Sequence, residues 1–464
     1  MSDFFLLLEQ GAHKYKSQVV LKDLDCKLTL PQLWESLKRY RGIIASKGIT
    51  KGMIVCLKME SNLDWAVSFL SLISLGIRVL PVAPDISAPD MCQIKDYLKP
   101  DFEIDREKWI SIISETPQQD IEPVWAEDED EVLLQPTSGS TGNPRYCIRT
   151  IAGLMAEGIS YRNTLSLTHN DIILNPLPLH HSYSLGMALM GGLMSYSSII
   201  FISRFSPRDF IKRLQRENVT VVPVVPVIAR YLVNLYSPEP VDLPCLRIIM
   251  AGAGKIPPET FEAFYEKYGI HLASNYGSTE TGAICSRLES ELYPAVGKPM
   301  WGIEMEIRDE EGRSLPDSKE GQVWVKTPGR LKRYWGEKEQ LSKDTFFPMG
   351  DLGYLNEEGA LHITGRSKSM INVGGKKVNP SHVEEILLRH PKVKDAAVVG
   401  VPRSTGEEMV KAVVVAEEEI ALTDLRMYIQ QNLADYEKPT RIKFVKALPR
   451  NELGKVKSQE LISI

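Results

Sequence analysis

The chain lacks the features that mark several large classes of protein. Its 464 residues carry a net charge of −5 and a pI near 6.0, so the basic surplus of a nucleic-acid-binding protein is absent. The six cysteines form no C-x-x-C pair, which gives no sign of a disulfide framework or a zinc site and fits a reducing cytoplasm. The apolar run from Trp65 to Ile77 lies between Asp64 and Arg78 and is too short to cross a membrane. We therefore expect a cytoplasmic protein that acts on small molecules or other proteins.

The pattern of apolar residues indicates an α/β protein with room for two or more domains. Up to about residue 125, helical patterns such as Leu30–Lys47 alternate with short apolar runs. From Ile151 onward, continuous apolar strands alternate regularly with amphipathic helices. This alternation predicts parallel-sheet layers covered by helices, with ligands bound in the turns that follow the strands.

One such turn, Leu134–Arg145 with the sequence LQPTSGSTGNPR, concentrates glycine and hydroxyl residues. It follows apolar residues that end a predicted buried strand, and its glycines and proline prevent regular structure. Its backbone amides and hydroxyls, with the cation of Arg145, suit an oligophosphate. A plain Gly/Ser-rich surface turn fits the loop alone equally well. The cation follows the second glycine by three residues, so the loop is not a Walker P-loop, and a P-loop kinase or GTPase is disfavoured.

Later turns add complementary chemistry. After the predicted strand LRIIM comes the small-residue turn AGAGKIP, and after HLAS comes NYGSTETG. In the second turn Tyr276 suits base stacking, Thr279 suits a phosphate and Glu280 suits a metal ion. Further along stand the segments FFPMGDLGYL, LHITGRSKSMINVGGKKVNPSHVEEIL and LPRNELGKVKSQEL. A plain turn explains any one of these segments, so their weight comes from their combination.

In this order the segments resemble the motifs of the adenylate-forming superfamily: acyl-CoA synthetases, luciferases, and aryl-acid and amino-acid adenylation domains. TSGSTGNPR is similar to the phosphate loop TSGSTG-x-P-K, and NYGSTE to the motif Y-G-x-T-E. GDLG is similar to the ribose-binding turn, GRSKSMINVGGKKVNPSHVE to the hinge and glycine loop, and RNELGKV to the terminal lysine motif. Five motifs in the family's order across nearly the whole chain leave little room for chance.

The resemblance implies a large N-terminal AMP-binding (adenylation) domain, residues 1–366, and a small mobile α+β C-terminal domain, residues 367–464, which acts as a lid and rotates about a hinge near Lys368. A helix, strand, strand, helix, strand pattern in the second part agrees with this, over Ser381–Leu388, Ala396–Val401, Lys411–Ala416, Thr423–Leu433 and Thr440–Val445. Ser381 and Glu384 are expected to form a capping box for the first of these helices.

The implied reaction is the activation of a carboxylate by ATP, which gives an acyl-adenylate and pyrophosphate, followed by transfer of the acyl group to a thiol. By this resemblance Thr279 contacts the region of the α-phosphate, Glu280 binds Mg²⁺, and Asp351 binds the ribose hydroxyls. Lys455 bridges the carboxylate and ATP. The residues implied in ATP binding are Thr137, Ser138, Gly139, Ser140, Thr141, Gly142, Arg145, Gly252, Ala253, Gly254, Asn275, Tyr276, Gly277, Asp351 and Arg366. Those implied in catalysis are Lys455, Thr279, Glu280 and His181.

The second step is expected to use a different arrangement of the same site. In the family the C-terminal domain rotates about the hinge, here Lys368. This rotation would remove Lys455, bring the Gly374–Gly375 loop to the site and open a tunnel for a pantetheine thiol.

The acid substrate is less well defined. In LPLHHSYSLG, His181 aligns with the family's aromatic gate beside the carboxylate, and Tyr183 lies near the acyl pocket. The His180–His181 pair is a poor metal site if the segment is extended, because adjacent side chains then point apart. Ser182 occupies the position where amino-acid-activating relatives carry aspartate, so an amino acid is disfavoured, because its ammonium would be buried without a counter-charge. We expect a small aromatic or aliphatic acid.

Two departures from the family pattern bear on ATP and on the acceptor. Arg145 replaces the usual lysine and keeps its charge but not its shape. Lys376 and Lys377 follow the glycine pair where relatives often carry an acid, which favours an anionic thiol donor. CoA is the favoured acceptor, and the phosphopantetheine of a carrier protein is the alternative. A degenerate relative that binds nucleotide or acid without turnover is a third possibility.

Overall fold

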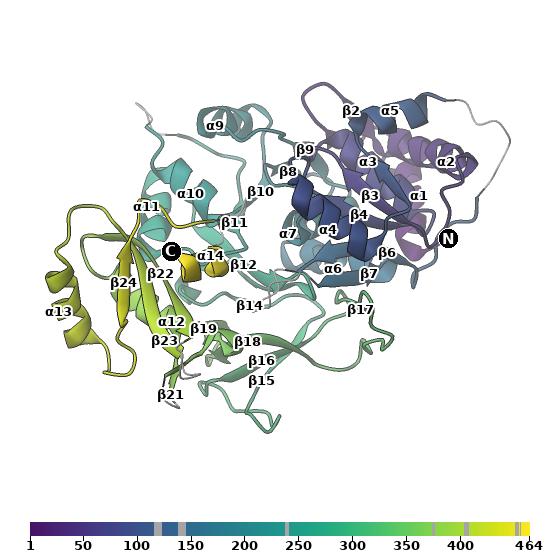
Figure 1. The fold of residues 1–464 in the computed structure, drawn as a ribbon. Coiled ribbons are helices and arrows are strands. Elements are labelled where there is room, and N and C mark those ends of the chain that lie inside the picture. Colours follow the sequence, from purple (N-terminus) through teal and green to yellow (C-terminus); the bar gives the residue numbers. More distant parts are fainter. Residues whose placement is uncertain are drawn as a thin grey trace. The chain divides into compact units, whose positions relative to one another are not determined.

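The computed structural model describes residues 1–115, 123–137, 145–236, 241–373, 376–402, 408–450, 454 and 456–464, with only the backbone of Lys368. The chain divides into two compact units (Figure 1). The first comprises Met1–Tyr293, Gly297–Glu304 and Lys326–Thr345, and the second comprises Pro294–Val296, Met305–Val325 and Phe346–Ile464. Within the described ranges, each helix is too short or too polar to cross a bilayer.

The first unit contains a six-stranded sheet built around the predicted glycine–hydroxyl loop. Its strands are β3 (Ile54–Lys58), β4 (Arg78–Val82), β5 (Phe102–Ile104), β6 (Glu131–Pro136), β7 (Tyr146–Thr150) and β17 (Arg333–Tyr334). They lie in the order β17-β7-β6-β4-β3-β5. β3 to β6 are parallel, whereas β6 pairs with β7, and β7 with β17, in antiparallel fashion. The loop therefore joins two neighbouring antiparallel strands.

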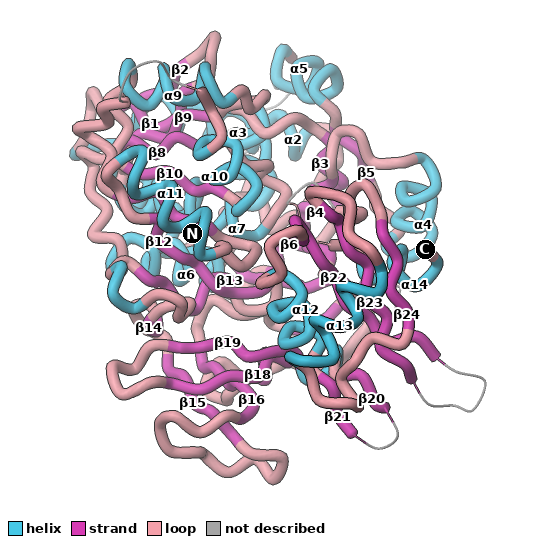
Figure 2. The backbone as a smooth tube through the Cα atoms, turned by 90° about the vertical axis from the view of Figure 1, so that its left-hand side faces the viewer, coloured by secondary structure: helices cyan, strands magenta, loops and turns pink. Residues whose placement is uncertain are grey.

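A second sheet of nine strands carries the other predicted turns. Its strands are β1 (Val19–Lys22), β2 (Lys27–Thr29), β8 (Ile172–Asn175), β9 (Ser198–Phe201), β10 (Val221–Val224), β11 (Ile248–Ala251), β12 (Leu272–Ser278), β13 (Gly282–Arg287) and β14 (Lys298–Pro299). The order is β14-β13-β12-β11-β10-β8-β9-β1-β2, and much of this row can be followed in Figure 2. The central strands are parallel, whereas β2, β13 and β14 pair in antiparallel fashion. The predicted α/β class is confirmed, and the antiparallel ends were not predicted.

Local sequence signals explain where several helices begin and end. The helices of the first unit are α1 (Asp3–Lys14), α2 (Leu30–Ser46), α3 (Leu63–Ile73), α4 (Ala88–Leu98), α5 (Arg106–Ser114), α6 (Ile151–Thr164), α7 (Ser182–Ser184), α8 (Gly192–Ser195), α9 (Pro207–Arg216), α10 (Pro226–Val233) and α11 (Pro258–Tyr268), with the π-helix η1 (Leu185–Gly191) and the 3₁₀ turn η2 (Ser290–Leu292). A capping box of Thr29 and Gln32 starts α2. Lys267 caps the C-terminus of α10, because its ammonium donates to the carbonyls of Leu232, Val233 and Leu235.

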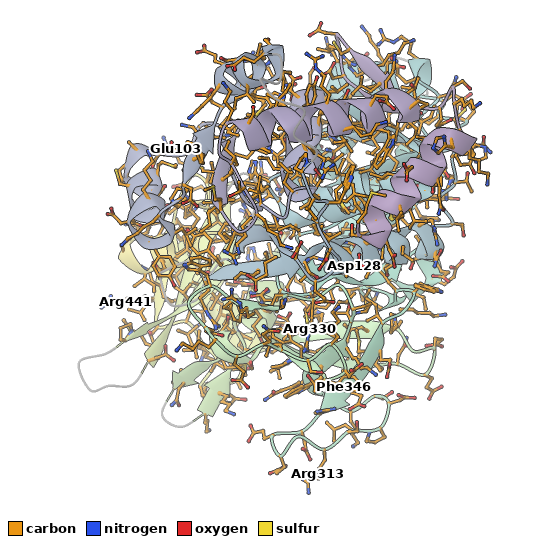
Figure 3. The ribbon with its side chains drawn as sticks, turned by 90° about the vertical axis from the view of Figure 1, so that its right-hand side faces the viewer. Glu103, Asp128, Arg313, Arg330, Phe346 and Arg441 are labelled. Carbon is orange, nitrogen blue, oxygen red and sulfur yellow. The ribbon has the colours of Figure 1, made fainter. Side chains whose placement is uncertain are left out.

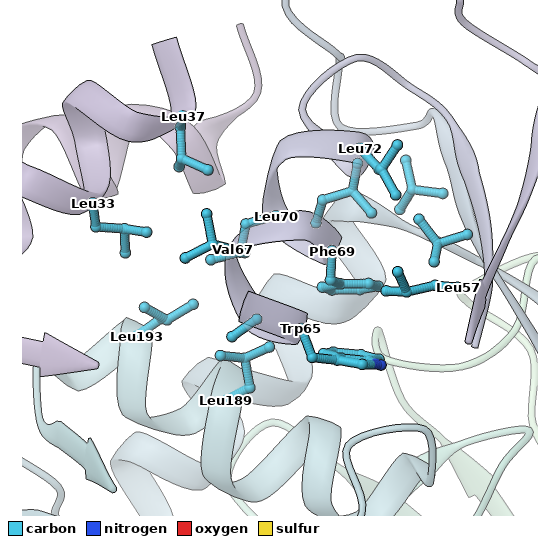
Figure 4. Packing of buried hydrophobic residues seen from close by; sticks show 14 of the residues in the cluster. Leu33, Leu37, Leu57, Trp65, Val67, Phe69, Leu70, Leu72, Leu189 and Leu193 are labelled. Carbon is cyan, nitrogen blue, oxygen red and sulfur yellow. The ribbon is translucent and has the colours of Figure 1, made fainter. Parts of the chain in front are cut away.

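Helix α3 lies at the centre of the largest apolar core. Apart from Asp64, its residues from Leu63 to Ile73 are buried, and the rings of Trp65 and Phe69 stack with centroids 5.1 Å apart. Side chains of α2, α3, η1 and α8 meet there, with Val67 of α3 facing Leu33 of α2 and Leu193 of α8 (Figure 4). Burying such a set stabilises the unit by about 25 cal/mol per Å² of apolar surface. The same packing fixes η1, which follows the predicted acid-binding residues.

The second unit contains three small sheets. The first is ordered β15-β16-β18-β19, the second pairs β20 with β21, and the third is ordered β22-β23-β24. The strands are β15 (Glu304–Arg308), β16 (Gly321–Lys326), β18 (Phe347–Leu355), β19 (Leu361–Arg366), β20 (Ile371–Val373), β21 (Lys376–Val378), β22 (Val393–Pro402), β23 (Glu408–Ala416) and β24 (Arg441–Phe444), and the helices are η3 (Ser367–Ser369), α12 (Pro380–Leu388), α13 (Leu422–Asn432) and α14 (Ser458–Ser463). Arg313, labelled in Figure 3, lies in the turn between β15 and β16.

The predicted helix, strand, strand, helix, strand pattern of the C-terminal part is confirmed by α12, β22, β23, α13 and β24. The predicted capping box of Ser381 and Glu384 is wrong. Asn379 is the N-cap of α12, and its side chain accepts from the Ser381 amide. Glu384 instead accepts a hydrogen bond from the Val398 amide, 2.8 Å away, and so ties α12 to β22.

Candidate active site

The base of the glycine–hydroxyl loop is held by the β6–β7 pair. Pro136 lies opposite Tyr146, and the Thr137 amide donates to the Arg145 carbonyl at 2.8 Å. The loop therefore starts and ends at neighbouring points of the sheet. Thr137 itself is buried. The predicted residues Ser138, Gly139, Ser140, Thr141 and Gly142 lie outside the described residues.

Arg145, at the far end of this loop, is held by a ring and a carboxylate. Its guanidinium lies 3.4 Å from the centroid of the Tyr334 ring and 2.5 Å from a carboxylate oxygen of Glu337. About half of the Arg145 side chain remains exposed, so the cation can still meet an anion. The planar guanidinium suits this stacked position, which a lysine ammonium cannot reproduce.

Tyr334 also connects Arg145 to the predicted metal ligand. Its hydroxyl donates to a carboxylate oxygen of Glu280 at 3.5 Å, and its backbone lies opposite Cys147 in the β7–β17 pair. Burial, and then the negative charge of Glu280, raise the pKa of Tyr334, so the hydroxyl stays protonated and remains a donor. Tyr334 and Glu337 were not predicted, because no sequence pattern around them suggested a partner for Arg145.

The turn that carries Thr279 and Glu280 has a fixed backbone. It joins β12 to β13, where Ser278 lies opposite Gly282. The Glu280 amide donates to the Ser278 hydroxyl at 3.2 Å, and the Glu280 carbonyl accepts from the Leu331 amide at 2.6 Å. Gly282 has a φ of +68°, which residues other than glycine rarely adopt. The Glu280 carboxylate is therefore presented from a rigid turn.

A buried ion pair contacts the turn that carries Thr279 and Glu280. Arg149 of β7 and Glu157 of α6 approach to 2.7 Å, and their side chains are 0% and 2% exposed. Glu157 accepts from the Ala283 amide at 3.2 Å, and Arg149 donates to the Gly329 carbonyl at 2.6 Å. A Cβ at Gly282 would lie 2.6 Å from the Glu157 carboxyl carbon. The pair thus joins the strand after the loop to the turn after Glu280, and it was not predicted from the sequence.

The turn after β11 approaches the segment predicted to bind the acid. Ala253 has a φ of +63°, and the Gly252 amide donates to the Val224 carbonyl at 3.0 Å. The ring of Tyr183 lies against Gly252, and its hydroxyl donates to the Met250 carbonyl at 2.7 Å. Gly254, at the end of the predicted turn, is exposed.

On the neighbouring strand β12, Asn275 is buried and accepts a hydrogen bond from the Tyr161 hydroxyl at 3.2 Å. Tyr276 and Gly277 follow Asn275 along β12, immediately before the turn that carries Thr279 and Glu280. Tyr183 therefore contacts the turn after β11, and Tyr161 contacts the middle of β12. The turns after both strands were predicted to bind ATP.

The two neighbouring histidines require a correction. They lie in a turn rather than in an extended segment, because the His181 amide donates to the Pro178 carbonyl and the Leu185 amide to the His181 carbonyl. Their rings therefore do not point apart, and their centroids are 4.3 Å from each other. Ser182 begins the short helix α7 directly after them. Among the residues that the structure describes, no group of three or more metal-binding side chains is present.

In the second unit the structure brings together Asp351 and Arg366. The two face each other across β18 and β19, with the guanidinium 2.8 Å from the carboxylate. The Asp351 side chain is 5% exposed, whereas that of Arg366 is 55% exposed. Two facing strands thus hold in place the Asp351 carboxylate, which was predicted from its motif alone.

Other predicted residues of this unit lie partly outside the described part of the chain. The backbone of Lys368 forms the turn η3, whose Ser367 hydroxyl donates to the Gly350 carbonyl at 3.1 Å. Gly374, Gly375 and Lys455 lie outside the described residues.

The two lysines after the glycine pair both have neighbours in their own unit. Lys377 pairs with Glu310 at 2.9 Å, and the Lys376 ammonium lies 4.8 Å from the centroid of the Tyr436 ring. The preference for an anionic thiol donor, which these lysines suggested, stays a prediction.

The α/β sheets, the loop between β6 and β7 and the acidic turn after β12 define an adenylate-forming protein, as the motifs predicted. The sequence profile of the AMP-binding enzyme family matches residues 8–335, and that of the AMP-binding enzyme C-terminal domain matches residues 382–455. The chain belongs to the AMP-binding enzyme family.

Several relatives of this chain are named as CoA ligases. A 2-succinylbenzoate–CoA ligase of Geobacillus kaustophilus (strain HTA426) is 28% identical over 480 residues, which cover 98% of this chain and 96% of the relative. A crotonobetaine/carnitine–CoA ligase of Citrobacter koseri is 32% identical over 352 residues, 73% of this chain and 67% of the relative. The structure of the O-succinylbenzoate coenzyme A synthetase of Bacillus subtilis in complex with ATP and magnesium ion has a TM-score of 0.86 and 24% identity, and covers 98% of both chains. This structural similarity shows that the two proteins share the same fold.

Proposed function

We propose that the protein uses ATP to convert a carboxylic acid into an acyl-adenylate, with release of pyrophosphate, and then transfers the acyl group to the thiol of CoA. The observation that carries the proposal is the connection from Arg145 through Tyr334 to Glu280, because it links a cation beside Thr137 to the carboxylate predicted to bind the metal ion. The names of the relatives, which are CoA ligases for two different acids, support the same reaction.

The first step requires two anions to meet. A carboxylate oxygen attacks the α-phosphorus of ATP, and the bond from that phosphorus to the bridging oxygen breaks, so the electron pair leaves with pyrophosphate. Positive charge in a fixed position lowers the barrier to such a step. Arg145 supplies one such charge beside the loop. Its contacts with Tyr334 and Glu337 hold the guanidinium in place before ATP arrives.

Glu280 fits a magnesium site of the kind that a nucleotide completes. Mg²⁺ is commonly bound by one or two protein carboxylates, while phosphate oxygens and water fill the remaining positions. Glu280 offers one carboxylate on a rigid turn, and Tyr334 donates to it. When bound, the ion would neutralise phosphate charge. The residues of this chain orient the carboxylate and keep the turn fixed.

The second step transfers the acyl group without a further nucleotide. The sulfur of the CoA thiolate attacks the acyl carbonyl carbon, and AMP leaves with the electron pair of the broken carbon–oxygen bond. We assign Lys455 to the first step only and the Gly374–Gly375 loop to the second, with a change of position about Lys368 between them. We further assign the ribose hydroxyls to Asp351, which Arg366 holds in place from the facing strand.

Pyrophosphate release across a panel of carboxylic acids, each with and without CoA, tests the reaction. Acid-dependent release together with an acyl-CoA product is the expected result. Pyrophosphate release without any CoA thioester would instead indicate that the acceptor is the phosphopantetheine of a carrier protein. ATP binding without release for any acid would instead indicate a nucleotide-binding module.

The variant Lys455→Ala separates the two steps. We expect adenylation to fall by about a hundredfold or more, because the variant lacks the cation that meets the developing charge. Conversion of a supplied acyl-adenylate to the CoA thioester should continue. Equal loss of both steps would contradict the assignment of Lys455 to the first.

A further inference from the structure

Helix α9 presents an exposed row of cations on a chain whose net charge is −5. Arg208, Lys212 and Arg216 follow one another at intervals of four residues, so they share one face of the helix, and all three are exposed. The other side of α9 carries apolar residues that are buried in the first unit. The helix lies at the outer margin of that unit (Figure 1). The basic face of α9 comprises this row and two neighbouring cations: Arg204, Arg208, Lys212, Arg213 and Arg216.

The acids of the protein leave most of this charge unpaired. Within the described ranges, four cations of the basic face lack an ion-pair partner: Arg204, Arg208, Lys212 and Arg213. Arg216 pairs with Glu217 at 2.9 Å, but Glu217 also pairs with Lys22 at 2.5 Å. Asp209 of α9 and Asp242, whose backbone carbonyl accepts from a side chain of the helix, are the exposed acids that the structure describes there. The basic face therefore keeps an excess of positive charge.

This arrangement lowers the stability of the helix itself. Like charges four residues apart repel each other, and the row contains two such pairs, Arg208 with Lys212 and Lys212 with Arg216. Arg208 also lies in the first turn, where the positive end of the helix dipole disfavours a cation. The stability of the fold does not explain these residues. An anionic surface outside the chain would convert both unfavourable terms into attraction.

Exposed tyrosines lie beside the basic face. The Tyr231 side chain on α10 is 55% exposed, and its ring stacks on that of Phe205 with centroids 6.5 Å apart, next to Arg204. Tyr236, shortly after α10, is 78% exposed. Tyrosine rings are enriched at the level of lipid headgroups, because they join an apolar ring to a polar hydroxyl. A bilayer is also a broad anionic surface that needs no matching pocket, which suits an exposed helix face with long, flexible cations.

We propose that the basic face of α9 binds the anionic headgroups of a phospholipid bilayer, so that the protein associates reversibly with a membrane surface. The contact is peripheral: the cations attract the charged groups of the lipids, while the apolar residues of α9 stay buried in the protein. Each lysine or arginine close to an anionic bilayer strengthens binding by about fivefold. This inference does not depend on the reaction proposed above.

Co-sedimentation of the full chain with lipid vesicles tests the contact. One set of vesicles contains phosphatidylcholine alone, and the other contains equal parts of phosphatidylcholine and phosphatidylglycerol. We expect binding to the second set only, with loss of binding as salt is added, because mobile ions screen exposed charges. The double variant Arg208→Glu/Lys212→Gln removes two cations and adds an acid, so binding should fall by about a hundredfold.

A second double variant, Arg441→Glu/Lys443→Gln, is the matched control. It makes the same change of net charge at two exposed residues of β24 and should bind the anionic vesicles as the wild type does. Thermal unfolding checks that both variants fold. Arg208→Glu places an acid in the first turn of α9, so its double variant should be at least as stable as the wild type.

The other possible results would overturn the proposal. Equal binding to both sets of vesicles would do so, and so would the absence of binding to the anionic set at low salt. An equal loss of binding in the control variant would assign the effect to net charge instead of the basic face. Binding to polyglutamate or to a DNA duplex, but not to the vesicles, would assign the face to an acidic protein or a nucleic acid and would exclude the bilayer as its partner.

Discussion

Replacing Glu157 by glutamine should reveal how strongly the buried ion pair supports the site. Glutamine keeps the size of the side chain and an oxygen for the Ala283 amide, but it leaves the Arg149 charge without its counter-charge. Both side chains are almost completely buried and 2.7 Å apart. Removal of one partner from such a pair typically costs about 3–5 kcal/mol, because the remaining charge stays away from water. We expect Glu157→Gln to lower the free energy of unfolding of the first unit by that amount.

Urea unfolding followed by tryptophan fluorescence measures this loss. Six of the seven tryptophans lie in the first unit and only Trp324 lies in the second, so the signal reports mainly on the unit that contains the pair. Glu217→Gln is the matched control, because Glu217 pairs with Lys22 at 2.5 Å but the lysine side chain is 35% exposed. That change should cost no more than about 1 kcal/mol.

A double variant tests the same ion pair in a second way. Adding Arg149→Met to Glu157→Gln removes the unpaired charge, so the double variant should recover part of the stability that the single variant loses. A loss of less than about 1 kcal/mol in Glu157→Gln would refute the argument. So would a double variant that is clearly less stable than the single one.

Three further changes have expected outcomes. Burial alone would raise the pKa of Glu131, but the hydrogen bond and charge of Arg333 hold this pKa below its usual range. The stability that the pair contributes is therefore lost as the pH falls through the lowered pKa. Glu131→Gln should flatten that part of the profile of stability against pH. Lys267→Met removes the ammonium that donates to the Val233 carbonyl at the end of α10 and should cost about 1–3 kcal/mol in thermal or urea unfolding. Arg145→Lys loses the flat stack on Tyr334 and should raise the KM for ATP about two- to fivefold, and an unchanged KM would show that the arginine is neutral.

Patterns confined to one stretch of the chain predicted the elements well. Continuous apolar runs located strands such as β11, and α12 to β24 appeared in the predicted order. The antiparallel strands β13 and β14 depend on partners that are distant in the sequence, which a local pattern does not report. The Arg149–Glu157 pair was missed for a related reason. A strand residue and a helix residue eight positions apart follow neither the period of a helix nor that of a strand.

The two local errors have identifiable physical causes. Pro380 is the first residue of α12, and proline at that position makes the preceding residue, Asn379, the N-cap in place of Ser381. The histidine pair was interpreted as extended, but hydrogen bonds from the amides of His181 and Leu185 close a turn there. In both cases a competing local hydrogen bond decided the outcome.

The winding of η1 allows its segment to hold one residue more than an α-helix would. In a π-helix the hydrogen bonds run from residue i to i+5, so each turn holds more residues than an α-helical turn. Seven π-helical residues therefore turn through nearly the same angle as six α-helical residues. Deleting one residue between Leu185 and Gly191 would return the segment to α-helical winding while Ser182 and Tyr183 kept their direction. Relatives with a one-residue gap here are therefore expected to present the residues before the gap in the same way.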